Sequence, residues 1–362
     1  MAVGIIGYNG SVGKTVTEYL LEKGFDVIGA SRHEHNFSYN SSTFRSAAID
    51  INNRKQLESF ISKCELVINC AAPAYIYAPL VAEVSGNMGC TYLDLTDSII
   101  GKALPEDNIY ISSCGYVPGL SAIFPDIIIK KYFESAESVC IYQGGTGMCS
   151  DMAMLDVILT SESSGYIDSF AHKGNIEKIT MDVKKTYSIE YMGKNIFLKP
   201  YLSYEMLHFA KLRNISSVRW FNAYVNMKQF AFFLRLITAL SKNDREKAFQ
   251  YMAKERNTRA EADKKKLYSV ISGDITGIIS GERKCMRFTH KVCDANAVCG
   301  IAAGYTAEKV LNNKSIKNGL YSGFEFVNEG ILDELEKHSG ENDFFKAEEI
   351  PLESSLENTI LK

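Results

Sequence analysis

The sequence predicts an α/β fold, in which a doubly wound parallel sheet is joined to an inserted α+β domain with a mainly antiparallel sheet. Three observations predict it. An apolar run at Ala2–Ile6 is followed by a glycine-rich turn and an amphipathic helix that ends at Gly24. Apolar runs then alternate with helical ones as far as Ser113, which is typical of a parallel sheet covered by helices. Beyond Ser138 long strand-like stretches predominate, which indicates an antiparallel sheet.

The same patterns give the expected elements in order. In the first domain, strands are expected at Asp26–Ala30, Glu65–Ala72, Thr91–Leu95 and Ile109–Ser113, with a helix at Ala78–Met88. Further on, strands are expected at Ser138–Gly144, Ile179–Met192, Val218–Val225, Tyr268–Gly277 and Cys285–His290, with helices from Ser150 through Ser161 and at Ala295–Leu311. The last helix should return to the first domain. The prediction is therefore a Rossmann domain of residues 1–125 and 295–362 and a substrate-binding and dimerisation domain of residues 126–294. The acidic tail from Glu341 is expected to be loosely packed.

The glycine turn carries the strongest functional signal. Gly7 allows a sharp turn after the strand, Gly10 allows the backbone to approach a pyrophosphate, and Gly13 allows the helix to pack closely on the sheet. Free N–H groups and the helix dipole favour an anion at a helix N-terminus, so the pattern predicts a dinucleotide site. A glycine-rich turn without a ligand is the other interpretation. The residues expected to bind the cofactor here are Gly7, Tyr8, Asn9, Gly10, Ser11, Val12 and Gly13.

The end of the second strand bears on which dinucleotide binds. An NAD site usually places an acidic residue there, on the ribose 2′-hydroxyl, whereas this chain has Ser31 and Arg32. A guanidinium offers a planar fork to a phosphate, which favours NADP(H). Asp26 begins this strand and cannot replace the missing acid. A solvated surface arginine is the alternative for Arg32.

Composition excludes several other classes. The chain has 362 residues and a formal net charge of -3, so nothing in its charge indicates a nucleic-acid partner. Nine cysteines without C-x-x-C spacing favour reduced thiols in a cytoplasmic protein, and neither they nor the histidines have metal-ligand spacing. The apolar segment Phe230–Leu240 is short and contains Arg235, which indicates a buried helix or an oligomer interface and not a membrane span. We expect no signal peptide before the first strand.

Four motifs resemble those of the saccharopine dehydrogenase-like reductases. They are VINCAAP at Val67–Pro73, YLDLTD at Tyr92–Asp97, CGYVPGLSAIFP at Cys114–Pro125 and, more loosely, QGGTG at Gln143–Gly147. The resemblance implies an NAD(P)-binding Rossmann domain assembled from both ends of the chain, an inserted α/β domain and a homodimer. It also implies hydride transfer, which interconverts an amine and an imine in typical members, while other members are enoyl reductases.

Two positions depart from this resemblance. Saccharopine reductases have an acidic residue in an L-D-P-G motif and a thiol in a C-G-G motif, where this chain has Val117 and Gln143. The acid and the thiol that the resemblance assigns to acid–base chemistry are thus replaced. We therefore expect a substrate other than saccharopine, namely an imine of another amino-acid-derived compound.

Reduction of an imine needs a proton at nitrogen, and four residues are candidates to supply it or to assist. Tyr116 and Cys114 follow the last strand of the first domain, where Tyr116 could donate a proton or bind a carboxylate and Cys114 could instead be structural. Asp97 follows a strand end and could orient the ribose, nicotinamide or substrate, or form a turn. His172 lies in a polar turn and could be a surface residue. Asp94 is expected to satisfy backbone donors.

The remaining candidates are binding residues. Ala71, Ala72 and Pro73 follow a strand and should contact the nicotinamide ribose. Gln143 and Tyr116 could bind a polar substrate, Gly144 and Gly145 allow its close approach, and Ser150 could bind a carboxylate or merely cap a helix. The sequence thus predicts an NADPH-dependent reductase of a C=N bond in an amino-acid-derived small molecule, and the preference for NADP favours a biosynthetic role. An enoyl or carbonyl reductase and a non-catalytic NADP-binding sensor or scaffold are the alternatives.

Overall fold

The computed structural model describes residues 2–33, 39, 41–146, 156, 165–182, 184–242, 244, 246–248, 250–252, 254 and 267–360. The chain forms two compact units. The first contains Met1–Ile123 and Asn296–Lys337, and the second contains Phe124–Ala295 and His338–Lys362. The predicted helix from Ser150 through Ser161 lies, except for residue 156, outside the described residues.

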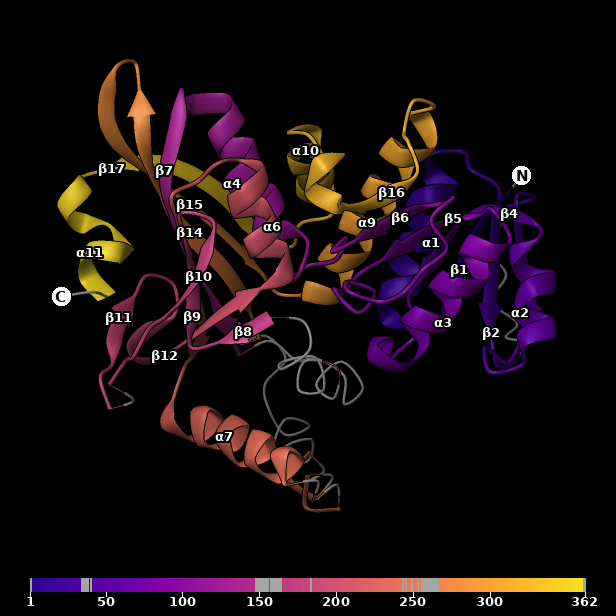
Figure 1. The fold of residues 1–362 in the computed structure, drawn as a ribbon, viewed down its shortest axis with the longest axis horizontal. Helices are drawn as coiled ribbons and strands as arrows, with labels where there is room; N and C mark the ends of the chain where they lie inside the picture. The colour runs from indigo at the N-terminus through magenta and orange to yellow at the C-terminus, as the bar shows by residue number, and fades with distance from the viewer. Residues whose placement is uncertain are drawn as a thin grey trace. The chain divides into compact units, whose positions relative to one another are not determined.

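The first unit is built on a sheet of seven parallel strands (Figure 1). In spatial order they are β16 (Gly319–Ser322), β6 (Ile109–Ser112), β5 (Thr91–Asp94), β4 (Cys64–Asn69), β1 (Ala2–Ile6), β2 (Val27–Ser31) and β3 (Phe44–Ala48). Every neighbouring pair is parallel. The strand order reverses between β1 and β4, which is the point where doubly wound folds bind ligands. The predicted doubly wound parallel sheet is confirmed.

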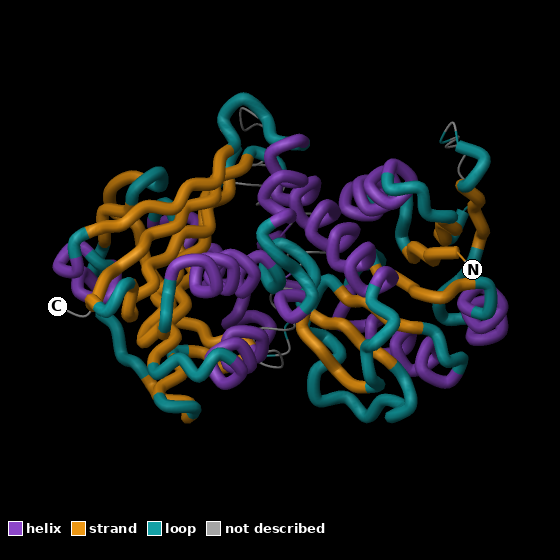
Figure 2. The backbone as a smooth tube through the Cα atoms, turned by 90° about the horizontal axis from the view of Figure 1, so that it is seen from above, coloured by secondary structure: helices purple, strands orange, loops and turns teal. Residues whose placement is uncertain are grey.

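Helices flank this sheet (Figures 1 and 2). They are α1 (Ser11–Glu22), α2 (Arg54–Ile61), α3 (Ala74–Asn87), α9 (Ala295–Asn312) and α10 (Gly330–Lys337). Two glycines of α9 allow it to pack closely on α1. A Cβ atom on Gly300 would lie 2.6 Å from the side chain of Thr15, and one on Gly304 would lie 2.6 Å from the ring of Tyr19. The segment near the end of the chain therefore supports the helix that follows the glycine turn.

The second unit contains a sheet of ten strands. Its main path runs β10 (Asn175–Lys178), β9 (Ser169–His172), β13 (Ser217–Tyr224), β7 (Ser135–Gly145), β14 (Ser269–Ile279), β15 (Glu282–Val292) and β17 (Phe344–Ile350). Strands β8 (Gly165–Ile167), β11 (Tyr187–Ile189) and β12 (Gly193–Ser203) join it at the side. Among the described pairs, β7 and β13 are parallel and the others are antiparallel. The predicted mainly antiparallel sheet is confirmed.

The register of the long strands separates the two faces of this sheet. Ile141 lies opposite Gly273, which lies opposite Phe288, and Phe288 contacts Phe124 of α4 (Leu120–Tyr132). Neighbouring positions point the other way, because side chains alternate along a strand. On that other face Cys140 and Tyr142 pack with Leu356 and Ile360 of α11 (Leu356–Ile360). Helices α6 (Tyr204–Leu212) and α7 (Met227–Ser241) also belong to this unit.

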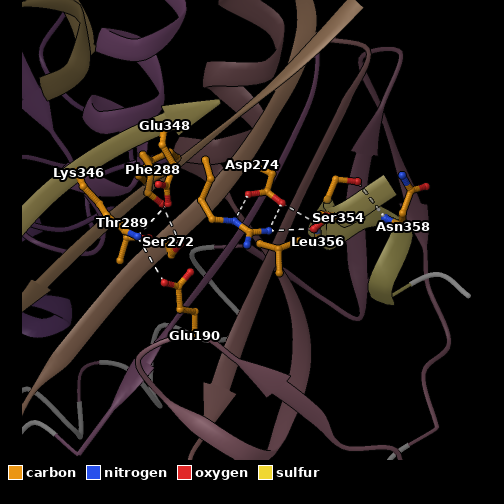
Figure 3. Close-up of polar contacts among 12 residues, drawn as sticks. Glu190, Ser272, Asp274, Phe288, Thr289, Lys346, Glu348, Ser354, Leu356 and Asn358 are labelled. Carbon is orange, nitrogen blue, oxygen red and sulfur yellow. Dashed lines mark hydrogen bonds and ion pairs between the residues drawn. The ribbon is translucent and has the colours of Figure 1, made fainter. Parts of the chain in front are cut away.

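The expectation of a loosely packed tail that belongs to the first domain is wrong for residues 338–362. They belong to the second unit, where β17 pairs with β15 over seven residues. A buried ion pair then holds the segment that follows (Figure 3): Arg287 donates to both oxygens of Asp274 at 2.7 and 2.8 Å. The same Asp274 accepts the backbone N–H of Leu356 at 2.6 Å, and Arg287 donates to the carbonyl of Ser354 at 3.1 Å. The acidic composition of the tail hid these contacts, since they use backbone groups and two residues far away in the sequence.

The predicted long strand at Ile179–Met192 is also wrong. Only Tyr187–Ile189 of it is a strand, and the chain reverses directly afterwards into β12. Tyr191 and Gly193 have φ values of 64° and 104°, in the left-handed region that suits a tight turn and not an extended strand.

Candidate functional site

The glycine turn forms a cradle of backbone between β1 and α1. Gly7 has a φ of 83°, donates its N–H to Ala30 at 2.8 Å, and accepts the N–H of Gly10 at 3.0 Å. A Cβ atom on Gly7 would lie 2.9 Å from the backbone nitrogen of Ala71. One on Gly13 would lie 2.2 Å from the carbonyl oxygen of Gly7. Backbone packing therefore requires glycine at both positions, and the loop is held in one shape.

The N-terminus of α1 fits a pyrophosphate. The helix begins after Gly10, and within the described part of the chain no side chain caps it. Its first turn contains Lys14 and no acidic residue, so nothing in the turn opposes a negative charge. Helix N-termini of this kind direct N–H groups and the positive end of the helix dipole at an anion. Asn9, Ser11 and Val12 stay partly or fully exposed around it.

Tyr8 turns away from this N-terminus into the core. Its side chain is buried, and its ring lies 5.6 Å from that of Phe44 on β3. A Cβ atom on Gly29 would lie 2.5 Å from the Tyr8 ring, so Gly29 makes room for it on β2. Only the backbone of Tyr8 is therefore placed to contact a ligand. Its side chain packs on the sheet and holds the loop in place.

The end of β2 lies at the same edge of the sheet. Arg32 is exposed there, and the Ser31 hydroxyl donates to the carbonyl of His33 at 2.6 Å. The loop after β3 joins this edge, since Ile49 donates its N–H to the carbonyl of Ser31 at 2.8 Å. Sequence reasoning missed this loop, although Asn53, which caps α2, was a readable sign of a helix start.

Ala71, Ala72 and Pro73 connect β4 to α3. The N–H of Ala71 donates to the side chain of Asn69 at 3.2 Å, and Pro73 precedes the first turn of α3. Ala72 is exposed, while Pro73 is buried. The predicted small-residue turn thus lies at the carboxyl end of β4, next to the glycine cradle through the contact of Gly7 with Ala71.

A buried polar network joins the carboxyl ends of β5 and β6. Its centre is Asp94, which is 0% exposed. The Asp94 carboxylate accepts the Tyr92 hydroxyl at 3.2 Å and the Thr96 N–H at 2.9 Å, and the Thr96 hydroxyl lies 3.1 Å from it. Burial raises the pKa of Asp94 to about 7, although each of these hydrogen bonds by itself lowers that pKa. The expectation that Asp94 serves backbone donors was thus incomplete, because two hydroxyl groups also bind it.

The predicted catalytic residues of the first unit lie in the two loops that this network connects. Asp97 is buried and accepts a short hydrogen bond from the hydroxyl of Ser113. Cys114 is fully buried, with its sulfur 3.4 Å from the carbonyl oxygen of Ser112, and its N–H donates to the Asp94 carbonyl at 3.1 Å. Tyr116 is buried two residues further on. The structure therefore brings the two loops that carry Asp97, Cys114 and Tyr116 together at one edge of the sheet.

The candidate residues of the second unit lie on different strands of its sheet, Gln143, Gly144 and Gly145 on β7 and His172 on β9. Gly144 and Gly145 serve strand packing, since Cβ atoms there would lie 2.1 Å from Ala223 and 2.3 Å from Tyr268. Gln143 is partly exposed and directly precedes the two glycines on β7. His172 ends β9 before a hairpin turn, and its Nδ1 atom has no hydrogen-bond partner among the described residues. Ser150 lies outside the described residues.

Comparison with known proteins decides the type of the first unit. Residues 3–112 match the family model described as the saccharopine dehydrogenase NADP binding domain. This segment of the first unit is similar to the NADP-binding domain of saccharopine dehydrogenase. The match includes the glycine cradle, the end of β2 with Arg32, and the Asp94 network. It supports NADP(H) as the cofactor of this domain, and it bears out the family resemblance for the two motifs that it includes, Val67–Pro73 and Tyr92–Asp97.

The fold of the whole chain has a relative among solved structures. Saccharopine dehydrogenase (L-Glu forming) from Saccharomyces cerevisiae matches with a TM-score of 0.67 and 14% identity, over 97% of this chain and 100% of that chain. Yeast methylglyoxal/isovaleraldehyde reductase with NADPH matches over 26% of this chain and 36% of that chain, with 18% identity and a TM-score of 0.23. Curated protein sequences give no significant match. The saccharopine dehydrogenase-type domain is thus combined with a second unit of the same overall fold as in the yeast enzyme.

Metal sites and membrane-spanning helices were the other possibilities considered for the described residues. No group of three or more histidine, cysteine, aspartate or glutamate side chains within them could hold a metal ion. None of the helices that they form combines the length and the apolar character needed to cross a membrane.

Proposed function

We propose that this protein is an NADPH-dependent reductase of a C=N bond in an amino-acid-derived small molecule, with a biosynthetic role. The observation that carries the proposal is the glycine cradle at the N-terminus of α1, within an NADP-binding domain of the saccharopine dehydrogenase type. The resemblance of the motifs to that family supports amine and imine chemistry. Val117 and Gln143, which replace an acid and a thiol, support a substrate other than saccharopine.

Each part of the site has a role in this proposal. The N–H groups at the start of α1 bind the pyrophosphate, and Arg32 pairs with the 2′-phosphate. The turn of Ala71, Ala72 and Pro73 contacts the nicotinamide ribose. When bound, NADPH supplies the hydride that goes to the imine carbon. Tyr116 donates the proton that the imine nitrogen takes up, and Asp97 fixes the loop before it through Ser113.

Amine dependence of NADPH oxidation tests the proposed reaction. Aldehydes and 2-oxo acids are mixed with amino acids, and NADPH absorbance is followed with and without the amine. The proposal predicts oxidation only where both partners are present. Oxidation by an enone or a carbonyl compound alone would indicate the enoyl or carbonyl reductase instead. Tight binding of NADPH without turnover of any mixture would favour the sensor or scaffold.

The role of Tyr116 is tested by Tyr116→Phe, which removes the hydroxyl and keeps the ring. We expect turnover to fall by about 10²-fold with unchanged affinity for NADPH, because a positioned general acid contributes roughly 10²- to 10⁴-fold. His172→Gln is the companion variant, since His172 is the other candidate donor. An unchanged rate in Tyr116→Phe together with a large loss in His172→Gln would assign the proton to His172.

Homodimeric assembly and a cytoplasmic location also belong to the proposal. They rest on the family resemblance and on the unpatterned cysteines of the sequence. Light scattering after size-exclusion chromatography measures the mass of the assembly, and a monomer at micromolar concentration would contradict the dimer.

A further inference from the structure

Asp94 is a buried acid that the proposed reaction does not use. It ends β5, one strand beyond β4 in the sheet, and its register partner on β4 is Asn69. In the proposed binding mode, Arg32 at the end of β2 would hold the 2′-phosphate of the dinucleotide, and the N-terminus of α1 would hold the pyrophosphate. The nicotinamide half would then reach the carboxyl ends of β4, β5 and β6. Asp94, at the end of β5, would therefore belong to the part of the site that receives the half of the cofactor that changes its charge during the reaction.

We propose that Asp94 is the internal counter-charge of the nicotinamide: ionised, it favours bound NADP⁺, and protonated, it favours bound NADPH. This rests on the proposed function, because it assumes that the cofactor binds in the cradle. Asp94 is a positioning residue in this proposal, since its side chain is fully buried and acts on the ring through its charge. The physical basis is that the oxidised ring is cationic and the reduced ring is neutral, and that a charge in a buried site is poorly screened.

The surroundings of Asp94 allow both of its charge states. Ionised, it is stabilised by the N–H of Thr96 and by the Tyr92 hydroxyl, and the Thr96 hydroxyl lies 2.7 Å from Ser98, which continues the network. Protonated at Oδ2, it can reverse the bond with Tyr92 and donate to the phenol oxygen. No change of fold is needed, because the Thr96 N–H can donate to Oδ1 in both states and the hydroxyl groups of the network can donate or accept.

The other titratable groups that act on Asp94, or on which it acts, are few among the described residues. They are Tyr92 on β5, Cys70 after β4 and Asp97 in the following turn, and Cys299 of α9 acts in turn on Cys70. Burial raises the pKa of Tyr92 and of Cys70 well above their ordinary values, so both stay neutral near pH 7. Burial also places the pKa of Asp94 at about 7, where its charge can respond to that of the ring.

The proposal links the charge of Asp94 to turnover. A hydride leaves NADPH for the imine carbon, the ring becomes cationic, and the pKa of Asp94 falls. Asp94 then releases its proton to solvent, separately from the proton that Tyr116 gives to the imine nitrogen, and Tyr116 takes up a proton from solvent in its place. Asp94 regains its proton when NADP⁺ is replaced by NADPH. Linkage requires the two effects to be equal: the charge of the ring changes the pKa of Asp94 by the same free energy by which the charge of Asp94 changes the relative affinity for NADP⁺ and NADPH.

The affinity ratio of the two cofactor forms tests this without any substrate. The dissociation constants of NADPH and NADP⁺ are measured by fluorescence titration and competition from about pH 6 to about pH 8. In the wild type, the ratio of the NADP⁺ constant to the NADPH constant should fall by up to roughly tenfold as pH rises, which corresponds to a coupling of about one pKa unit between Asp94 and the ring. Titration of the 2′-phosphate cancels in this ratio, because both forms carry it.

Variants assign the effect to Asp94. Asp94→Asn keeps an acceptor for Thr96 and a donor toward Tyr92, which resembles the protonated acid, and its ratio should not change with pH. Asp107→Asn removes an exposed carboxylate from the loop before β6 and should behave as the wild type. Tyr92→Phe and Thr96→Val remove donors that stabilise the ionised form, so the midpoint of the transition should move to higher pH.

Calorimetry provides a second readout. Near pH 7, binding of NADP⁺ to the wild type should release more protons than binding of NADPH, as seen from the dependence of each binding enthalpy on the ionisation enthalpy of the buffer. In Asp94→Asn the two forms should release equal numbers of protons, because the contribution of the 2′-phosphate is common to both. Binding of both forms with a ratio independent of pH in the wild type, or the same pH dependence in Asp94→Asn, would overturn the inference alone. Failure of the protein to bind either form would overturn the proposed function and this inference with it.

Discussion

At the scale of single residues, the surroundings of a side chain determine its properties more than its residue type does. Asp94 and Asp97 both follow β5 within one turn, and both were visible in the motif YLDLTD. The structure assigns them different surroundings: Asp94 lies at the centre of a hydroxyl network, whereas Asp97 ties its turn to Ser113 on the next loop. Alternation along the strand predicts that Asp94 faces away from its leucine neighbours, but it does not reveal that Tyr92 and Thr96 meet it there.

The raised pKa of Asp94 predicts an effect on stability with a definite sign. The pKa of this carboxyl is about 7 in the folded protein and 3.8 in the unfolded chain. Its contribution to the stability of the folded state is therefore fully present below pH 3.8 and is lost as the pH rises to about 7. The free energy of unfolding of Asp94→Asn minus that of the wild type should therefore increase by on the order of 4 kcal/mol between about pH 4 and about pH 8. Urea titrations across this range measure it, and a difference that is constant with pH would contradict the assignment.

At the scale of elements, the first helix depends on contacts that are distant in sequence. Tyr19 of α1 donates to Glu308 of α9 at 2.7 Å, and Lys23 contacts Glu334 of α10 at 2.9 Å. Lys337 also contacts Glu334, at 2.7 Å. The helix that presents its N-terminus to the cofactor is thus held by α9 and α10 from near the end of the chain.

The Glu334 pair gives a second prediction with the opposite sign. Burial alone would raise the pKa of Glu334, but hydrogen bonds from Lys337 and Lys23 outweigh it and the pKa is lowered. The contribution to stability is therefore present at neutral pH and lost as pH falls through the folded pKa. Glu334→Gln should destabilise the first unit by roughly 1 kcal/mol at pH 7, and less in acid, as measured by urea unfolding. Glu58→Gln, in an exposed pair with Arg54, is the control, and an equal loss in both variants would argue against the bridge between α1 and α10.

At the scale of the whole molecule, the sequence predicts the parallel sheet well and the second unit less well. Strand β1 is a continuous apolar run and β4 contains one at its centre, both largely buried, so their pattern can be recognised without knowledge of their neighbours. β17 and α11 are different, because their stability comes from β15 and from the Asp274–Arg287 pair, which no local pattern shows. The exposed strand β10 was missed for the same reason, since its order comes from the hairpin with β9.

The candidate site follows the same division. Gly7, Gly13 and Arg32 were predictable because a strand, a turn and a helix of one continuous segment position them. Gly144 and Gly145 were interpreted as places of approach for a ligand, whereas the structure shows that neighbouring strands occupy the space beside them. Spacing in the sequence cannot distinguish a glycine that admits a ligand from one that admits a strand.

Attachment of the tail in the second unit can be tested through its ion pair. Asp274 is 2% exposed, and Asp274→Asn leaves Arg287 without its counter-charge in a mostly buried site. We expect a loss of about 3 to 5 kcal/mol in the stability of the second unit, with NADPH affinity retained by the first. Glu137→Gln, in the exposed pair with Arg283, should cost less than about 1 kcal/mol. Thermal unfolding of both variants measures this, and equal small losses would show that the buried pair does not hold the tail.

The most direct test of the whole account is the choice between NADPH and NADH. The wild type should bind NADPH more tightly by at least about tenfold, since a guanidinium–phosphate pair contributes roughly 1.5 to 3 kcal/mol. Arg32→Ala should lose most of that preference by weakening NADPH and leaving NADH unchanged, while Arg54→Ala, which removes an exposed arginine of α2, should keep it. Fluorescence titration of the three proteins with both cofactors gives the answer. Equal affinity of the wild type for NADPH and NADH would contradict the account.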